Sequence, residues 1–408
     1  MDKLEIYLVG GAVRDKLLHL PVKEQDWVVV GSTPEELIAG GFLQVGKDFP
    51  VFLHPETKEE YALARTERKI APGYYGFQCN FDPSVTLEED LSRRDFTINA
   101  IAEDLDGKII DPFHGQQDLA AKIFRHISPA FSEDPVRILR LARFAARFAP
   151  MGFTIALETI ALLREMVARG EVDALVPERV WQEMERSLKE TDPTQFFMVL
   201  RTCDALKQLW PALDKLWGVP EKIEYHPEAN VGIHVMMVLK KATELSSDPI
   251  TRFAALCHDL GKGETPSNEW PSHKEHEERG VPLIEEFCQK YRVPNAYRDL
   301  AKMVSRYHIN CHRAFELKAS TILKMLERLD AFRKPERFEQ FLIACQADFN
   351  GRIGSEEKAY PQAERLRAAL HAAKNVDIKS LVDQNLMGEI LKEKIHEERV
   401  RAIKEQLS

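Results

Sequence analysis

Short apolar runs separated by glycine- and proline-containing turns occupy the first part of the chain. Tyr7–Val9 predicts a strand that a Gly-Gly turn follows, and a helix is expected to start near Val13. After a loop that contains Pro21, the β-branched run Asp26–Val30 predicts a second strand. The pattern therefore indicates a strand, a turn, a helix and a strand in succession.

The following segments continue this mixture of strands and helices. A helix is predicted from Thr33, with acidic residues in its first turn, and the alternating segment 59–65 predicts a strand. Residues 65–77 are polar and basic with proline and glycine, which indicates a flexible loop. Ile109–Gly115 predicts a strand and turn that close this α/β part.

From about residue 132 the hydrophobic period becomes helical. Ser132 is expected to cap a helix over 132–148 that buries an apolar face. Its other face carries a row of basic residues: Arg137, Arg140, Arg143 and Arg147. Residues from about 150 to 222 are also helical by pattern, with tryptophans expected in the core at Trp181, Trp210 and Trp217. The segment after about 353 is charged helix.

Composition narrows the class of protein. The 408 residues are 44% hydrophobic and 30% charged, which is ordinary for a globular chain of two to four domains. No apolar run reaches the roughly 18–20 residues of a membrane span, and the six scattered cysteines form no C-x-x-C pair. We therefore expect a cytoplasmic protein without a membrane anchor. The net charge of −9 means that any nucleic-acid contact must use local basic patches.

The Gly-Gly turn and the acids beyond it are the first candidate site. Gly10 and Gly11 let a ligand approach the backbone, and the following helix offers free N–H groups and Arg14 to a phosphate. Glu24 and Asp26 point to one side of a strand and can hold Mg²⁺ for phosphoryl or nucleotidyl transfer. Taken singly, the glycine pair favours a packing turn and the acidic pair favours a solvated surface. Their combination in the order strand, turn, helix, acids and strand favours a functional site.

The segment LVGGAVRD and the acid-x-acid strand resemble the head of bacterial class II CCA-adding enzymes (tRNA nucleotidyltransferases) and poly(A) polymerases, in the polymerase-β-like superfamily. The resemblance implies that Glu24 and Asp26 are catalytic Mg²⁺ ligands and that Gly11 and Arg14 bind ATP or CTP. Glu24 stands where the family usually has aspartate, and its side chain is one methylene longer. Glu60 resembles a third acid of this site, although a glutamate on an edge strand fits the pattern equally.

Two further motifs continue the resemblance. RRDFTINA at 93–100 resembles the family's second motif, which implies that Arg94 and Asp95 contact the sugar and triphosphate, while Thr97 and Asn99 brace the turn. The loop 65–77 would help to switch between the addition of C and of A.

The segment Glu133-Asp134-Pro135-Val136-Arg137 resembles the family's base-reading motif. A carboxylate accepts from the exocyclic amine that C and A share, and a guanidinium donates to the ring atom beside it. The resemblance implies that Asp134 and Arg137 read the base, with Arg140 and Arg143 at the triphosphate, whereas the spacing alone fits a solvated basic face. Glu178 and Arg179 would support the base-reading pair.

A second candidate site starts near residue 228. His234, the pair His258-Asp259 and Asp348 follow the H…HD…D order of HD-type metal phosphohydrolases, which some bacterial CCA-adding enzymes carry as a fused domain. Imidazole and carboxylate together suit a divalent transition metal such as Ni²⁺. The alternative is an inactive helical scaffold. Other candidates are less well placed: His273 and His276 fit either the metal site or a solvated loop, and a surface turn is favoured for His308, Cys311 and His312.

The sequence thus predicts a polymerase-β-like α/β head followed by all-α neck, HD and tail regions. The expected domains are a head with its base-reading helix at 1–150, an RNA-binding neck at 151–227, an HD domain at 228–350 and a helical tail at 351–408. The expected head reaction is addition of C, C and A from CTP and ATP to tRNA. The HD domain would act as a phosphatase, 2′,3′-cyclic phosphodiesterase or 2′-nucleotidase. A poly(A) polymerase and an inactive RNA-binding protein are the alternatives, and both a monomer and a homodimer are compatible.

Overall fold

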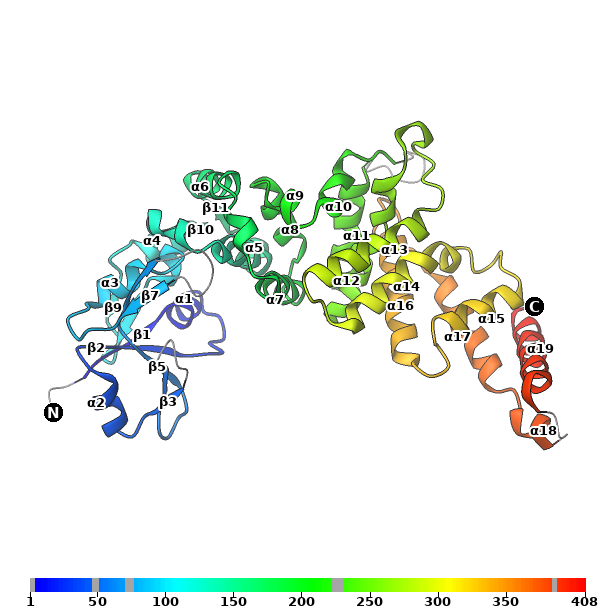
Figure 1. Ribbon diagram of the computed structural model, residues 1–408, viewed down its shortest axis with the longest axis horizontal. Coiled ribbons are helices and arrows are strands. Elements are labelled where there is room, and N and C mark those ends of the chain that lie inside the picture. Colours follow the sequence, from blue (N-terminus) through cyan, green and yellow to red (C-terminus); the bar gives the residue numbers. More distant parts are fainter. Residues whose placement is uncertain (1–3, 46–50, 70–76, 222–229, 384–386) are drawn as a thin grey trace. The chain divides into compact units, whose positions relative to one another are not determined.

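The structure is a computed structural model, and it describes residues 4–45, 51–69, 77–221, 230–383 and 387–408. The chain divides into two compact units (Figure 1). The first unit comprises Met1–Glu183 with Gln195–Ala205, and the second comprises Met184–Thr194 with Leu206–Ser408. The first contains all the strands of the described part, and the second is helical, so the predicted order of an α/β head and helical regions is confirmed.

A seven-stranded mixed sheet forms the first part of unit one. Only β2 and β5 are parallel neighbours, and the other neighbouring pairs are antiparallel. In spatial order the strands are β3 (Leu43–Val45), β4 (Val51–Leu53), β5 (Glu60–Leu63), β2 (Asp26–Val30), β1 (Glu5–Val9), β8 (Ala102–Asp104) and β9 (Ile109–Ile110).

Both faces of this sheet are packed, because successive residues of a strand point to opposite sides. Val28 packs with Val9 and Leu91 on one side, whereas Val29 packs with Phe52 and Leu37 on the other. Leu37 belongs to α2 (Pro34–Ala39) and Leu91 to α3 (Leu87–Ser92), and α1 (Gly11–Leu17) contacts β1. Helix α4 (Gly115–Ala121) contacts the 3-10 turn at Thr97–Asn99. A sheet buried on both sides gives the loops at its ends a rigid base.

The local signals at the helix starts explain these positions. Gly10 has a φ of 69°, and a Cβ on it would lie 2.8 Å from Nη1 of Arg94, so the turn needs glycine. Helix α1 begins at Gly11, two residues before the expected start. Helix α2 begins next to Thr33, as predicted, and Thr33 caps it through a reciprocal pair of bonds with Glu36. Thr86 caps α3 in the same manner.

Two expectations about the first unit are wrong. The segment expected to be a flexible loop contains β6 (Thr66–Lys69), which pairs with β7 (Phe77–Asn80); residues 70–76 lie outside the described part. Ser132 does not cap the basic helix, because it belongs to a short 3-10 helix at Pro129–Glu133. The basic helix is α5 (Val136–Phe148).

Helix α5 buries an aromatic and aliphatic face, as its period predicts. Ile138, Leu139 and Leu141 have no exposed surface, and Phe144 and Phe148 pack with other phenylalanines around Phe124. A small sheet of β10 (Ile123–Phe124) and β11 (Thr154–Ile155) lies beside this packing. The helices that follow are α6 (Leu157–Ala168), α7 (Pro177–Leu188), α8 (Thr194–Thr202), α9 (Ala205–Leu209) and α10 (Pro211–Asp214).

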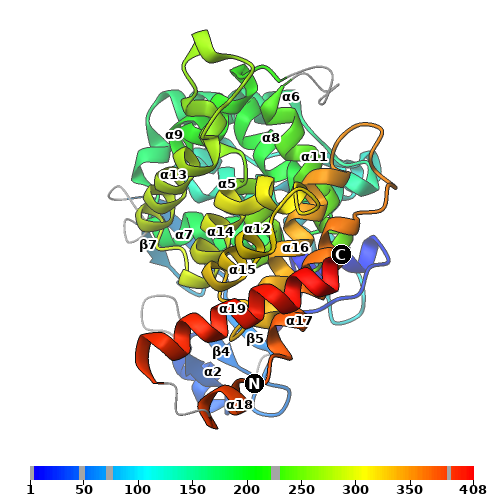
Figure 2. The ribbon, with the colours of Figure 1, turned by 90° about the vertical axis from the view of Figure 1, so that its right-hand side faces the viewer.

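The rest of the second unit is a helical array whose interior holds the second candidate site. Its apolar core includes Trp210, which stacks on Phe287 with 3.8 Å between ring centroids. Helices α17 and α19 lie side by side in both ribbon views (Figures 1 and 2). The helices are α11 (Val231–Leu245), α12 (Pro249–Cys257), α13 (His276–Lys290), α14 (Asn295–His312), α15 (Ala319–Arg328), α16 (Pro335–Asn350), α17 (Pro361–Lys374), α18 (Ile378–Asp383) and α19 (Gly388–Leu407). Within the described ranges, no helix combines the length and apolar character that crossing a bilayer requires.

Candidate active sites

A cavity of about 530 Å³ lies where β1 ends and β2, β5 and α5 begin. Its volume is within the range of small-molecule sites, roughly 300–1,000 Å³. The cavity brings together residues that are far apart in the sequence. The predicted site residues that line it are Gly10, Gly11, Arg14, Glu24, Asp26, Glu60, Arg94, Asp95, Asp134, Arg137 and Arg140.

Three carboxylates lie on the sheet side of this cavity. Asp26 opens β2 and is in register with Glu60 on the parallel strand β5, and Glu24 lies just before β2. Strand β5 lies between β4 and β2, so the interpretation of Glu60 as an edge-strand glutamate is wrong. Clustered carboxylate oxygens are the ligands that hard divalent cations such as Mg²⁺ prefer.

The charge of Asp26 depends on its neighbours. Partial burial raises the pKa of Asp26 above its ordinary value, Arg94 opposes this shift, and the nearby Glu24 adds to it. A carboxylate whose ionisation a neighbouring carboxylate disfavours, as for Asp26, gains from a cation beside it. These residues therefore fit a bound divalent cation.

Arg94 lies at the floor of the cavity. Its Nη1 faces Gly10, and its Nη2 donates to Oδ2 of Asp90 at 3.0 Å. Asp90 also accepts from Arg93 at 2.6 Å. Burial raises the pKa of Asp90, but the two arginines outweigh it and lower the pKa. Arg94 is thus held beside the acids, where its second amino group can meet a phosphate.

Arg14 makes contacts that the sequence did not indicate. Its side chain is 3% exposed and donates to Oδ1 of Asp15 and, at 2.6 Å, to Oδ1 of Asn99. Its guanidinium also lies 4.9 Å from the ring centroid of Phe148. Arg14 therefore links α1 to α5 and to Asn99 of the RRDFTINA segment, and it also lines the cavity.

Asp95 anchors the arginine at the middle of α5. Oδ2 of Asp95 accepts two hydrogen bonds from Arg140, at 2.7 and 2.9 Å, and Oδ1 accepts from Asn99. Burial alone would raise the pKa of Asp95, but Arg140 and Asn99 outweigh it and lower the pKa to about 2. Asp95 also lines the cavity, so its predicted contact with the sugar and triphosphate stays a prediction, and its bonds to Arg140 position that arginine beside the same cavity.

Replacing Asp95 by asparagine should destabilise the first unit by about 2 kcal/mol at pH 7, because the pKa falls from 3.8 to about 2 on folding. A lowered pKa in the folded state stabilises above the unfolded pKa, so this contribution is lost as the pH falls from about 4 to about 2. Amide hydrogen exchange of peptides from residues 93–147, corrected for intrinsic rates, measures this loss of stability in the variant relative to the parent. Equal protection of these amides in the parent and in the asparagine variant at pH 7 would show that the Asp95–Arg140 contact does not stabilise the first unit.

The two residues predicted to read the base, Asp134 and Arg137, lie at the start of α5. Oδ1 of Asp134 accepts from the backbone N of Val136 at 3.0 Å. Arg137 donates to the carbonyl oxygens of Ala130 and Arg93, and burial lowers its pKa. Both side chains are fixed by the backbone and line the cavity, as a rigid edge for recognition requires.

The last two arginines of the row lie beyond the cavity. Nε of Arg143 donates to Glu183 at 2.6 Å, and Nη2 of Arg147 donates to Asp15 at 2.9 Å. Neither is among the residues that line the cavity. Within the described first unit, these contacts join α5 to α7 and α1. The role predicted for Arg143 at the triphosphate has no support in this arrangement.

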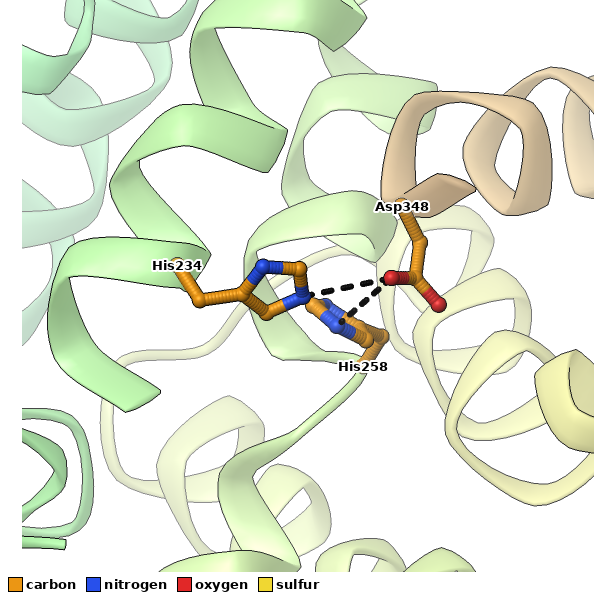
Figure 3. Close-up of side chains that lie close together, drawn as sticks. All are labelled: His234, His258 and Asp348. Carbon is orange, nitrogen blue, oxygen red and sulfur yellow. Dashed lines mark hydrogen bonds and ion pairs between the residues drawn. The ribbon is translucent and has the colours of Figure 1, made fainter. Parts of the chain in front are cut away.

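A second site lies in the interior of the second unit. His234 of α11, His258 at the end of α12 and Asp348 of α16 converge (Figure 3), and we call these three residues the first cluster. Nε2 of His234 lies 3.2 Å and Nε2 of His258 lies 3.7 Å from Oδ1 of Asp348. Each is 1% exposed or less. Buried imidazoles around a carboxylate suit a divalent transition metal.

Asp259 lies between this cluster and two further histidines. Its Oδ2 lies 3.0 Å from Nε2 of His258 and 2.8 Å from Nζ of Lys262. Its Oδ1 lies 3.2 Å from Nε2 of His276 and 3.6 Å from Nε2 of His308. We call Asp259, His276 and His308 the second cluster.

The two aspartates of these clusters are held ionised. Burial would raise the pKa of Asp259, but His258 and Lys262 outweigh it and keep the pKa well below its ordinary value. Burial acts likewise on Asp348, where Arg352 and His312 lower the pKa well below the ordinary value. Buried carboxylates in the charged form are ready metal ligands.

Of the histidines after residue 270, His276 lies near the candidate metal site, which is one of its two predicted placements. His276 is buried at the start of α13, and His308 and Cys311 are buried on α14, so the surface turn expected for His308, Cys311 and His312 is wrong. His312 donates through Nε2 to Asp348 at 2.5 Å. His273 is buried but contacts Thr265 and the Pro220 carbonyl, outside both clusters. His308 and His312 lie one turn apart on α14, whereas His276 opens α13 and His273 precedes it.

Three protein-family models match successive parts of the chain. Residues 6–125 match the family described as "Poly A polymerase head domain". Residues 152–216 match "Probable RNA and SrmB- binding site of polymerase A", and residues 231–337 match "HD domain".

Solved structures share the fold at low sequence identity. A Thermotoga maritima CCA-adding enzyme complexed with tRNA is 20% identical, with a TM-score of 0.63 over 99% of this chain and 91% of that chain. A Bacillus stearothermophilus CCA-adding enzyme in complex with CTP is 23% identical, with a TM-score of 0.66 over 98% of this chain and 89% of that chain.

Full-length relatives are much closer in sequence. The multifunctional CCA proteins of Thioalkalivibrio sulfidiphilus and of Nitrosococcus oceani are each 60% identical to the chain over 402 residues, which is 98% of each sequence. Such identity over nearly the whole length covers the head, the neck and the HD domain together. The chain therefore belongs to the family of multifunctional CCA proteins.

Proposed function

We propose that this enzyme adds C, C and A to the 3′ end of tRNA from CTP and ATP without a nucleic-acid template. The observation that carries the proposal is the cavity in which three carboxylates of the sheet face the basic start of α5. A polyphosphate requires the basic side, and the cations of nucleotidyl transfer require the acidic side. The relatives at 60% identity, named as multifunctional CCA proteins, support it.

Glu24 and Asp26 would hold Mg²⁺, with Glu60 beside them on β5. When bound, Mg²⁺ neutralises charge on the phosphates and favours attack by the tRNA hydroxyl. The Gly11 end of α1 offers backbone N–H groups to a phosphate, and Arg94 and Arg140 offer guanidinium groups from two other directions. The chain thus orients the nucleotide between a fixed acidic edge and a fixed basic edge.

Asp134 and Arg137 would select the base. The carboxylate and the guanidinium both line the cavity, and such a pair can bond the exocyclic amine and the adjacent ring atom that C and A share. Because Arg137 donates to two backbone carbonyls, its free edge has a fixed direction. U and G present a different edge and would be rejected.

The longer side chain of Glu24 is the clearest departure from the family's usual aspartate. Replacing Glu24 by alanine should lower the single-turnover rate of incorporation by about 10²- to 10³-fold, because a cation ligand contributes several kcal/mol. Replacement by aspartate keeps the ligand and should stay within about tenfold of the parent, at a shifted Mg²⁺ requirement. Rates measured across an Mg²⁺ titration test both, and an alanine variant as fast as the parent would remove Glu24 from the site.

The reaction itself is tested with tRNA transcripts that end before CCA, before CA and before A. Labelled CTP and ATP are supplied singly and together with Mg²⁺. Growth by only the missing nucleotides, followed by arrest, is the expected result. A long ladder of A would indicate a poly(A) polymerase instead, and no incorporation would contradict transfer by the head.

We also propose that the first cluster and Asp259 hold a divalent transition metal such as Ni²⁺ and hydrolyse phosphoesters at RNA ends. The residues fit the metal, since Nδ1 of His258 donates to a carbonyl at 2.7 Å, which leaves Nε2 as a ligand facing Asp259 and Asp348. A bound metal supplies Lewis acidity to the phosphoryl group. Hydrolysis of a 2′,3′-cyclic phosphate and of a 2′-phosphate, each assayed with added Ni²⁺, tests this activity.

The division of labour along the chain is part of the proposal. We assign nucleotide addition to residues 1–150 and phosphoester hydrolysis to residues 228–350. Residues 151–227 would contact RNA, and residues 351–408 would form a helical tail. The match of residues 152–216 to a family described as a probable RNA-binding site supports the neck assignment. The cytoplasmic location and the choice between monomer and homodimer stay predictions from the sequence.

A further inference from the structure

The cavity beside the two histidine clusters is too small for more than the end of a substrate. It has a volume of about 240 Å³, its lining includes His276, His308 and Ile309, and we call it the hydrolytic cavity. Sites for small molecules usually measure roughly 300–1,000 Å³, so this one has room for a terminal phosphate and its sugar. In an RNA chain, the nucleotides before that terminus must therefore lie on the surface outside the cavity.

Helix α14 connects the hydrolytic cavity with a larger one. Ile309 lines the first, whereas Arg306 and Lys302, which precede it on the helix, line a cavity of about 520 Å³. Side chains three or four residues apart lie on one face of a helix, so the two cavities are neighbours along one face of α14. We call the larger one the α14 cavity, and its lining also includes Arg328 of α15 and, from α14 itself, Met303 and Tyr307.

Contacts between α13 and α14 lead outward in the same direction. These two helices lie side by side (Figures 1 and 2). Starting at the hydrolytic cavity, the pairs are His276–His308, Glu278–Arg306 and Glu285–Lys302, with 3.2 Å between the imidazole nitrogens and then 2.9 and 3.1 Å between nitrogen and oxygen. From His308 to Lys302 the distance along the axis of α14 is about 9 Å. Phosphates of a stacked strand follow one another at about 3.4 Å, so this row is as long as about two to three nucleotides.

Basic groups of the α14 cavity are available to phosphates. Arg328 is exposed and, within the described ranges, has no acidic partner. Lys302 and Arg306 pair with Glu285 and Glu278, but the side chains of those acids are 54% and 64% exposed. Exposed ion pairs contribute little free energy, so a phosphate can take the place of either acid.

The same lining offers surface for bases. Tyr307 and Met303 are half-buried beside Arg306. Bases stack on aromatic side chains whatever their sequence, and basic groups next to such side chains hold the backbone of a single strand. Asp299 also lines the cavity, but it is paired with Arg298 at 2.9 Å between nitrogen and oxygen. The mixture of basic, aromatic and apolar side chains therefore suits a single-stranded nucleic acid.

We infer that the α14 cavity binds the last nucleotides of an RNA 3′ end whose terminal phosphate enters the hydrolytic cavity. This inference rests on the proposed hydrolysis of phosphoesters at RNA ends, and it names a single-stranded polynucleotide, rather than a free nucleotide, as the substrate class of that site. Lys302, Arg306 and Arg328 contact the phosphates, and a base stacks on the ring of Tyr307. Because contacts to phosphates carry no sequence information, the site accepts ends of any sequence.

Hydrolysis of two substrates by the full-length protein loaded with Ni²⁺ tests this surface. One substrate is a 2′,3′-cyclic mononucleotide, and the other is a single-stranded hexaribonucleotide that ends in a 2′,3′-cyclic phosphate. The parent should have a KM about tenfold lower for the hexaribonucleotide, because only that substrate reaches the α14 cavity. Arg306→Gln/Arg328→Gln should raise this KM by about tenfold at unchanged kcat and leave the KM for the mononucleotide as it is.

Lys240→Gln/Arg333→Gln is the matched control, since it removes the same charge from the second unit. The side chains of Lys240 and Arg333 are 63% and 81% exposed, and neither residue lines either cavity. The control should keep the parent's KM for both substrates. Equal KM values of the parent for both substrates, or a hexaribonucleotide KM that the Arg306/Arg328 variant leaves unchanged, would overturn the RNA contact and leave the hydrolysis standing.

Crosslinking tests the same contact without turnover, so it still decides if neither substrate is hydrolysed, which would contradict the proposed hydrolysis itself. A hexaribonucleotide that ends in a 2′-phosphate and carries thiouridine before its last residue is irradiated with the parent, and the crosslinked peptides are mapped. We expect crosslinks within residues 299–307, at a yield that falls about tenfold in Arg306→Gln/Arg328→Gln. Crosslinks confined to residues 1–227 would show that the α14 cavity does not hold RNA.

Discussion

Replacing Asp26 by asparagine will reduce incorporation of C and A into tRNA by at least about 10³-fold, while hydrolysis by the second unit stays unchanged. Asp26 opens β2 between Glu24 and Glu60, so its carboxylate is the central one of the three that face the basic side of the cavity. Loss of a cation ligand removes several kcal/mol of transition-state stabilisation. Asparagine keeps the shape and one acceptor oxygen but removes the charge.

Single-turnover extension of a transcript that lacks CCA measures this loss. Glu5→Gln is the matched control, since Glu5 is an exposed acid on the neighbouring strand β1 that does not line the cavity. The control should extend the transcript at the parent's rate. Extension within about tenfold of the parent by the asparagine variant would show that Asp26 is no ligand of a required cation.

Metal removal will separate the two activities of the protein. After treatment with a chelator, Mg²⁺ alone will restore incorporation into tRNA, whereas hydrolysis will stay at least about 10³-fold reduced until Ni²⁺, Co²⁺ or Mn²⁺ is added. The head offers carboxylate oxygens, which suit Mg²⁺, and the second unit offers imidazoles, which suit transition metals. The two sites should therefore be reloaded independently.

Initial rates of both reactions in one preparation, with each cation added singly, measure this separation. His258→Gln is the informative variant, because it removes a ligand of the first cluster and leaves the head intact. No cation should restore its hydrolysis, and Mg²⁺ should restore its incorporation. Recovery of hydrolysis by Mg²⁺ alone would contradict the assignment of a transition metal to the imidazole site.

Local signals in the sequence predicted much of the first unit. The Gly-Gly turn, the strand Asp26–Val30 and the cap at Thr33 each depend on residues close together in the chain, and each was placed correctly to within about two residues. The four HD residues were expected to converge, and they do.

Features set by distant contacts escaped the sequence pattern. The arginine row of α5 extends about 15 Å along the helix axis, and only its first two arginines lie beside the cavity. Arg143 and Arg147 lie further along the helix and contact Glu183 and Asp15. Nothing near Asp15 in the sequence indicates this partner. His308 likewise reaches Asp259 only because two helices pack closely, which no short-range spacing encodes.

Glycines beside Asp259 leave this part of the interior little room to adjust. A Cβ on Gly261 would lie 2.5 Å from the backbone N of Gly280, and a Cβ on Gly280 would lie 2.5 Å from Oγ of Ser305. Alanine at either position should therefore push the segment after Asp259 away from α13 and α14, which carry His276 and His308. Such a variant should disturb the second cluster before it unfolds the domain.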